Sequence, residues 1–252
     1  MLTIAMLVYA LTPEIAEMTR RNVDALLANT MGDFELRVLF NGGPPVALPA
    51  DERLVPIYMA ERSSIAKAYN LAFSEARGDV FACVHNDVAA PRGWDVVMRD
   101  AMVDGFAFPM VLEDARECAE RGIGTTQAGF PPGCCFMFPR ALYAALGGFD
   151  EAFEGCHFED NDLWLRGMLA GYPMTRANVE VEHGRGKTRT SLPDLANPDF
   201  VRNKQVYINK HRQPDGSVPI PTLEERPWQR LHESDISFAG STGPSVTATS
   251  TL

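Results

Sequence analysis

Apolar segments typical of buried strands alternate with helical segments over the first ninety or so residues, and this alternation constrains the fold most. Thr3–Ala10 is almost entirely apolar, which suits a strand covered on both faces. Thr12 and Pro13 then supply an N-cap and a first residue for a helix ending near Asn29. Further strands are predicted at 34–40, 54–58 and 80–83, with a helix over 64–77 before the last. The pattern predicts an α/β fold with a mainly parallel central sheet and helices on both faces.

The second half of the chain continues this pattern less regularly. We expect helices at 94–103, 140–146, 159–170 and 197–210, and strands at 106–112, 134–138 and 174–181. Residues 1–212 are therefore predicted to form one domain. Residues 213–252 form a C-terminal extension, which from about Ser234 is rich in Ser, Thr and Gly and is predicted to be disordered.

The segment Glu113–Pro132 is polar, contains glycines and shows little periodicity. The simpler interpretation is a solvated connector. A functional interpretation is a mobile flap over a bound ligand, since active-site lids are commonly built from such segments.

Composition excludes several classes of protein. The net charge of −10 argues against a protein that binds nucleic acid through its phosphates. Five cysteines without C-x-x-C spacing indicate reduced thiols and not a disulfide framework or zinc site. No apolar run approaches the roughly 18 residues of a membrane span, and the first residues lack the features of a signal peptide. We therefore expect a soluble, cytoplasmic protein.

Three sets of polar residues lie where chemistry is expected. Asp87 follows a buried strand, at the edge where open α/β sheets bind ligands. His183 follows a later strand, so it could complete a site begun by Asp87; together with phosphate oxygens, these two residues would suit Mn²⁺ better than Mg²⁺. Glu159 and Asp160 open a helix, where an ionised carboxylate is favoured and could act as a general base. Helix capping, with an Asp162–Arg166 pair, is the structural alternative for the last set.

The order of these motifs resembles that of the family 2 glycosyltransferases, which have the GT-A fold. The matching stretches are, in order, an apolar strand before Thr-Pro-Glu, Leu-Phe-Asn-Gly-Gly, Ala-Lys-Ala-Tyr-Asn-Leu-Ala, Ala-Arg-Gly-Asp-Val, His-Asn-Asp with Pro-Arg-Gly-Trp, Gly-Gly-Phe-Asp-Glu, Glu-Asp-Asn-Asp-Leu-Trp-Leu-Arg and the late His183. The resemblance covers residues 3 to 210. It implies an inverting transferase that uses a nucleotide-diphosphate sugar, a divalent metal and a hydroxyl acceptor.

The resemblance also implies roles for individual residues. Asp87 matches the Asp that ends the family's D-x-D motif and binds the metal and, through it, the donor. His183 matches a late metal-associated histidine, and Asp160 matches the catalytic base. Tyr9 and Asn41 would line the pocket of the donor nucleotide, and Arg62 lies near a family position that can contact its phosphate.

The chain departs from the family pattern at three places. Val8-Tyr9-Ala10-Leu11 replaces the usual Pro-Thr-Tyr-Asn at the end of the first strand. His85 stands where D-x-D has its first Asp, and Phe40 stands where a carboxylate often reads the nucleotide base. The altered motif is the best support for an alternative function, a non-catalytic carbohydrate-binding or assembly module on the same fold. A sugar-phosphate nucleotidyltransferase is a further alternative, but it would need a glycine-rich, basic loop after the first strand.

Overall fold

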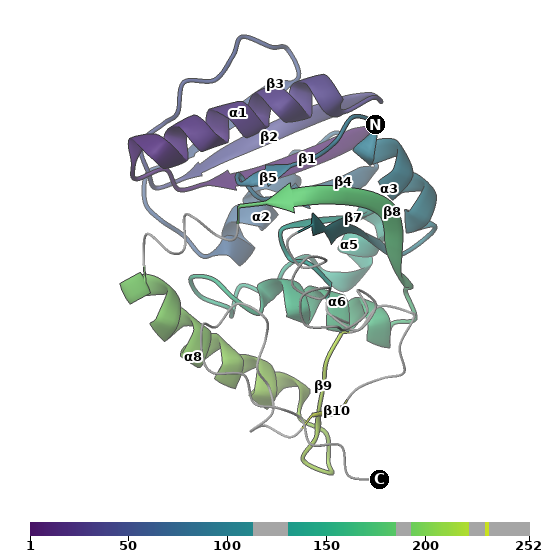
Figure 1. The fold of residues 1–252 in the computed structure, drawn as a ribbon. Coiled ribbons are helices and arrows are strands. Elements are labelled where there is room, and N and C mark those ends of the chain that lie inside the picture. The colour runs from purple at the N-terminus through teal and green to yellow at the C-terminus, as the bar shows by residue number, and fades with distance from the viewer. Residues whose placement is uncertain (113–130, 185–192, 222–229, 232–252) are drawn as a thin grey trace.

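The computed structural model describes residues 1–112, 131–184, 193–221 and 230–231 (Figure 1). The predicted flap at Glu113–Pro132, apart from its last two residues, lies outside the described residues. So does the predicted disordered tail from Ser234.

Eight strands of the described chain form one sheet, in the order β3-β2-β1-β4-β7-β6-β8-β5. The strands are β1 (Leu2–Val8), β2 (Phe34–Asn41), β3 (Leu54–Met59), β4 (Val80–Val84), β5 (Val88–Ala89), β6 (Phe106–Val111), β7 (Cys135–Pro139) and β8 (Met174–His183). Strands β3, β2, β1 and β4 are parallel. Strand β7 runs antiparallel to β4 and β6, β6 is parallel to β8, and β5 is antiparallel to β8. A separate short pair joins β9 (Val218–Pro219) to β10 (Arg230–Leu231).

Helices cover both faces of this sheet (Figure 1). They are α1 (Pro13–Asn29), α2 (Ile65–Ser74), α3 (Trp94–Met102), α5 (Arg140–Leu146), α6 (Glu159–Leu169) and α8 (Pro193–His211). Apolar residues of α1 and α3 share one core cluster, and those of α2, α5 and α6 share the other. Helix α8 packs through Tyr207 and Ile208 against Phe158 and Leu165, in a third cluster beside α6. None of the helices in the described ranges is long and apolar enough to cross a lipid bilayer.

The side chains of β4 show that the sheet is covered on both faces. In β4, Val80 and Ala82 point into the α1 side of the core, whereas Phe81 and Cys83 point into the α2 side. All four side chains are buried, as a strand with two covered faces requires. Because β1, β2 and β4 are parallel, their carboxyl ends meet at one edge, and the residues that follow them are brought together there.

The predicted elements are confirmed, with shifts at their ends, but the short pair of β9 and β10 was not among them. Strand β8 continues two residues beyond the predicted end, to His183, and α8 begins at Pro193 instead of Asn197. The short strand β5 was not predicted. It consists of two residues only, and its existence depends on pairing with β8, almost a hundred residues away.

Candidate metal and donor site

Three potential metal ligands converge where β5 meets β8. Val88 pairs with His183 in the antiparallel ladder, which brings the adjacent Asp87 against the end of β8. The His183 Nε2 atom lies 3.3 Å from Asp87 Oδ1. His85 completes the group, and one ligand atom from each of the three residues lies within 4.8 Å of the others.

The loop that carries His85 and Asp87 is fixed by backbone and side-chain hydrogen bonds. The Asn86 amide donates to Thr19 Oγ1 of α1 (2.9 Å), and Asn22 of α1 donates to the Asn86 carbonyl (2.7 Å). The His85 N–H donates to the carbonyl of Cys134 at 2.8 Å. The Asn86 side chain points towards α1, so its neighbours His85 and Asp87 can face His183 instead.

One carboxylate and two imidazoles fit a divalent transition metal. The Asp87 side chain is only 3% exposed, and a carboxylate so deeply buried is costly unless a cation or hydrogen bonds compensate it. Imidazole nitrogens suit Mn²⁺ or a later transition ion better than Mg²⁺, which prefers oxygen ligands. His85 departs from the family motif, so the sequence motif did not identify it as a candidate ligand. Its spacing of two residues from Asp87 was the available signal.

The residues predicted to line the donor nucleotide also come together. The Arg62 guanidinium lies 5.6 Å from the centroid of the Tyr9 ring. The Asn41 amide accepts a hydrogen bond from Ser63 N (2.8 Å) and donates one to Ser63 O (3.0 Å). In this structure Asn41 therefore holds the segment that carries Arg62, and Arg62 in turn lies 3.7 Å from Asp199 of α8.

Phe40 is a core residue and not a substitute for a base-reading carboxylate. Its side chain is 1% exposed and stacks on Tyr58, with 5.0 Å between ring centroids. At this position the chain therefore has a buried aromatic ring where the family often has a carboxylate that reads the base.

Asp160 lies at the start of α6, near the same edge of the sheet. Its Oδ1 atom accepts a hydrogen bond from the Asn161 N–H at 2.7 Å. A Cβ atom on Gly133 would lie 2.2 Å from Asp160 Oδ2, so only glycine leaves room for this carboxylate. The carbonyl of the next residue, Cys134, accepts a hydrogen bond from the His85 N–H. Gly133 and Cys134 therefore lie between Asp160 and the loop that carries His85 and Asp87.

The electrostatic surroundings of Asp160 suit a proton acceptor. Burial raises the pKa of Asp160 to about 6, although the Asn161 N–H opposes the shift. Burial and the charge of Asp160 raise the pKa of neighbouring Glu159, whose Oε2 has no hydrogen-bond partner among the described residues. The two carboxyls therefore differ, with Asp160 ionised near neutral pH and Glu159 favoured in its protonated form.

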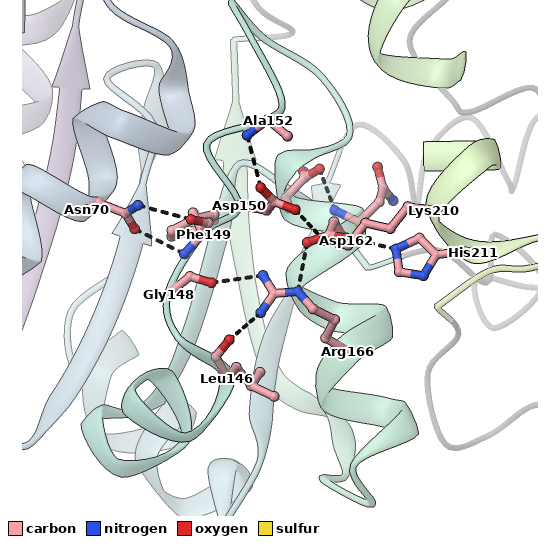
Figure 2. Close-up of polar contacts among 12 residues, drawn as sticks. Asn70, Leu146, Gly148, Phe149, Asp150, Ala152, Asp162, Arg166, Lys210 and His211 are labelled. Carbon is pink, nitrogen blue, oxygen red and sulfur yellow. Dashed lines mark hydrogen bonds and ion pairs between the residues drawn. The ribbon is translucent and has the colours of Figure 1, made fainter. Parts of the chain in front are cut away.

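Asp162 is structural, as the predicted pair with Arg166 suggested (Figure 2). Its carboxylate binds Arg166 Nε (2.7 Å), Lys210 Nζ (2.8 Å) and His211 Nε2 (2.7 Å). Although burial opposes it, the His211 hydrogen bond and the charges of Arg166 and Lys210 lower the pKa of Asp162 to about 2. Arg166 also donates to the carbonyls of Leu146 and Gly148, which joins α6 to the end of α5.

Comparisons with known proteins agree with this fold. Residues 130–187 match a protein family described as the N-terminal domain of galactosyltransferase. Comparison with curated protein sequences gives no significant match.

Several solved structures have a similar fold. A mannosyltransferase from Pyrobaculum calidifontis in complex with GDP-Man and Mn²⁺ aligns with a TM-score of 0.60 and 16% identity, over 85% of this chain and 66% of that one. GalNAc-T7 with UDP, GalNAc and Mn²⁺ gives 0.55 and 10%, over 72% and 42%. TarS from S. aureus gives 0.52 and 11%, over 80% and 64%.

These likenesses establish that the chain has the GT-A fold of nucleotide-sugar transferases. They do not single out family 2, which the sequence motifs resemble. The chain spans between 42% and 66% of the length of these three structures.

Proposed function

We propose that the chain is a metal-dependent glycosyltransferase that moves a sugar from a nucleotide-diphosphate donor to an acceptor hydroxyl, with inversion. The observation that carries the proposal is the convergence of His85, Asp87 and His183 at the edge of the sheet where Asp160 also lies. Two of the similar structures were determined with Mn²⁺ and a nucleotide or nucleotide sugar, which supports the same ligand classes here.

In this proposal His85, Asp87 and His183 hold Mn²⁺, with Mg²⁺ a poorer fit to the two imidazoles. When bound, the metal supplies positive charge that stabilises the leaving diphosphate. Arg62 and Tyr9 flank the donor, and Asn41 keeps Arg62 in place through Ser63. In this arrangement Asp87 binds the metal and, through the metal, the donor.

Asp160 acts as the general base. Its carboxylate accepts the proton of the acceptor hydroxyl while the hydroxyl oxygen attacks the anomeric carbon from the face opposite the leaving diphosphate. A base must be ionised to work, and the pKa of Asp160 is raised to about 6. Activity is therefore expected above about pH 6 and should fall as the pH drops through that value.

We also infer a location in the cytoplasm. The four cysteines in the described part of the chain, Cys83, Cys134, Cys135 and Cys156, are free thiols, which is typical of proteins in a reducing compartment.

The proposal is tested by measuring donor hydrolysis and transfer with Mn²⁺ for the wild type and Asp160→Asn. Asparagine keeps the size of the side chain but cannot take the proton, so the rate should fall by about 10²–10⁴-fold while donor affinity is retained. Asp100→Asn, on the exposed side of α3, is the matched control and should leave the rate unchanged.

Two results would oppose the proposal. Transfer by Asp160→Asn at close to the wild-type rate would remove Asp160 from the mechanism. Donor binding by the wild type without hydrolysis or transfer of any nucleotide sugar would favour a non-catalytic binding module.

A further inference from the structure

The loop that leads into α6, residues 154–158, has a strained backbone. His157 has φ of 80° and Phe158 has φ of 72°, in the left-handed region that residues with side chains rarely adopt. Such conformations persist only where the surrounding structure enforces them, and they concentrate at functional sites. Here they stand two and three residues before the carboxylate of Asp160.

Asn203 of α8 supplies the contacts that hold this loop. Its side chain is fully buried. Its Nδ2 atom donates to the carbonyls of Glu154 (2.8 Å), Cys156 (2.8 Å) and His157 (3.0 Å). A single buried amide group therefore binds three carbonyls of the backbone before α6, and Arg202 Nη2 adds a second hydrogen bond to the Glu154 carbonyl (2.6 Å).

The same loop also contacts the start of α2, close to Arg62. The Ile65 N–H donates to the carbonyl of Gly155 at 2.8 Å. A Cβ atom on Gly155 would lie 1.9 Å from Asp199 Oδ2, so the α8 carboxylate packs directly on the loop backbone. Asp199 also lies 3.7 Å from Arg62. The loop thus lies between the donor-side segment and the helix that carries Asp160.

Helix α8 is itself fixed at its far end. Lys210 and His211 both bind the buried carboxylate of Asp162 (Figure 2). Asp162 lies in the same first turn of α6 as Asp160. Asn203 lies between this anchor and the Asp199 contact. Contacts to loop 154–158 and to α6 therefore hold the helix on either side of Asn203.

We propose that Asn203 is a positioning residue for glycosyl transfer: its amide fixes loop 154–158, and the loop fixes the first turn of α6 and the carboxylate of Asp160. This inference rests on the proposed function. No direct contact between Asn203 and Asp160 is required. Small displacements of a reacting group cost large factors in rate, because the attacking and accepting atoms must be aligned.

The experiment compares Asn203→Ala with Asn209→Ala, which changes an exposed residue of the same helix. Each variant is assayed with Mn²⁺ and nucleotide sugar at a temperature well below its unfolding midpoint. Asn203→Ala should lower kcat by about ten- to a hundredfold, with donor KM and Mn²⁺ affinity within about twofold of the wild type. Asn203→Ser, which keeps one donor, should recover part of the loss and replaces Asn203→Ala if the latter does not fold.

A purely structural role predicts a different result: a lower unfolding midpoint with kcat per folded molecule unchanged. That result, or a parallel rise in KM and fall in kcat, would overturn the inference.

Failure of the proposed function is distinguished by NMR titration of the Asp160 carboxyl carbon, which needs no turnover. Loss of the Asn203 contacts should admit water to the first turn of α6, so the pKa of Asp160 should fall from about 6 towards its usual 3.8. Identical titrations in the wild type, Asn203→Ala and Asn209→Ala would overturn the positioning role even if the protein transfers no sugar.

Discussion

Asn86 shows how one side chain outside the ligand set can determine a metal site. It lies between two of the candidate ligands, and its amide is bound to Thr19 of α1 at 2.9 Å. The backbone carbonyl of Asn86 also accepts a hydrogen bond from the Asn22 side chain, at 2.7 Å. Helix α1 thereby orients the loop that carries His85 and Asp87, although it contributes no ligand itself.

We predict that Asn86→Ala weakens Mn²⁺ binding by about 10–100-fold, the usual effect of losing a group that orients ligands. Electron paramagnetic resonance of free Mn²⁺ measures the affinity. Asn29→Ala is the matched control, because Asn29 also anchors this region to α1, through the Ala90 carbonyl at 2.8 Å, but further from the ligands. Equal affinities of Asn86→Ala and Asn29→Ala would show that the loop holds its shape without Asn86.

At the scale of elements, Glu35 joins three parts of the sheet at the edge opposite the site. Its Oε1 atom accepts from Thr3 Oγ1 of β1 (2.7 Å) and from Arg77 N, before β4 (2.6 Å). Arg77 Nε donates to its Oε2 at 3.1 Å. Burial by itself raises the pKa of Glu35, but the hydrogen bonds from Arg77 and Thr3 outweigh it and hold the pKa below its usual 4.5.

Glu35→Gln should therefore lower the free energy of unfolding by about 3 kcal/mol at pH 7, as for a broken buried ion pair. Because the folded-state pKa is depressed, the ionised carboxylate stabilises the fold fully above pH 4.5 and less as the pH falls through the folded-state value. The difference between the two proteins in urea denaturation should shrink accordingly. Glu17→Gln, which removes an exposed pair with Arg20, is the control and should change stability by less than about 0.5 kcal/mol. A pH-independent difference would contradict the assigned role of Glu35.

The elements predicted from sequence were those with strong local signals. Thr12 and Ser64 each cap a helix through the side chain, accepting from Ile15 N and Lys67 N respectively. Continuous apolar runs marked β1 and β4. The strand β5 and the final two residues of β8 had no such signal, because they exist through pairing with each other.

At the scale of the whole molecule, the sequence predicts the parallel half of the sheet better than the rest. Strand–helix alternation predicts a mainly parallel sheet over β1 to β4, whereas the insertion of β7 between β4 and β6 depends on contacts across long separations. The same holds for the site. Asp87 follows β4 and His183 ends β8, so the two could be predicted to meet. The approach of His85 to them and the contacts of Asn203 depend on packing that no local pattern encodes.

We expect this edge of the sheet to bind a nucleotide diphosphate through a metal held by His85, Asp87 and His183. Calorimetric titration of UDP and GDP, with Mn²⁺ and with a chelator, tests it most directly in the wild type and Asp87→Asn. At least one of the two nucleotides should bind the wild type in the presence of Mn²⁺. Its affinity should be at least about tenfold lower with the chelator, and equally low for Asp87→Asn under both conditions. Equal affinity with and without Mn²⁺, or undiminished binding by Asp87→Asn, would contradict it.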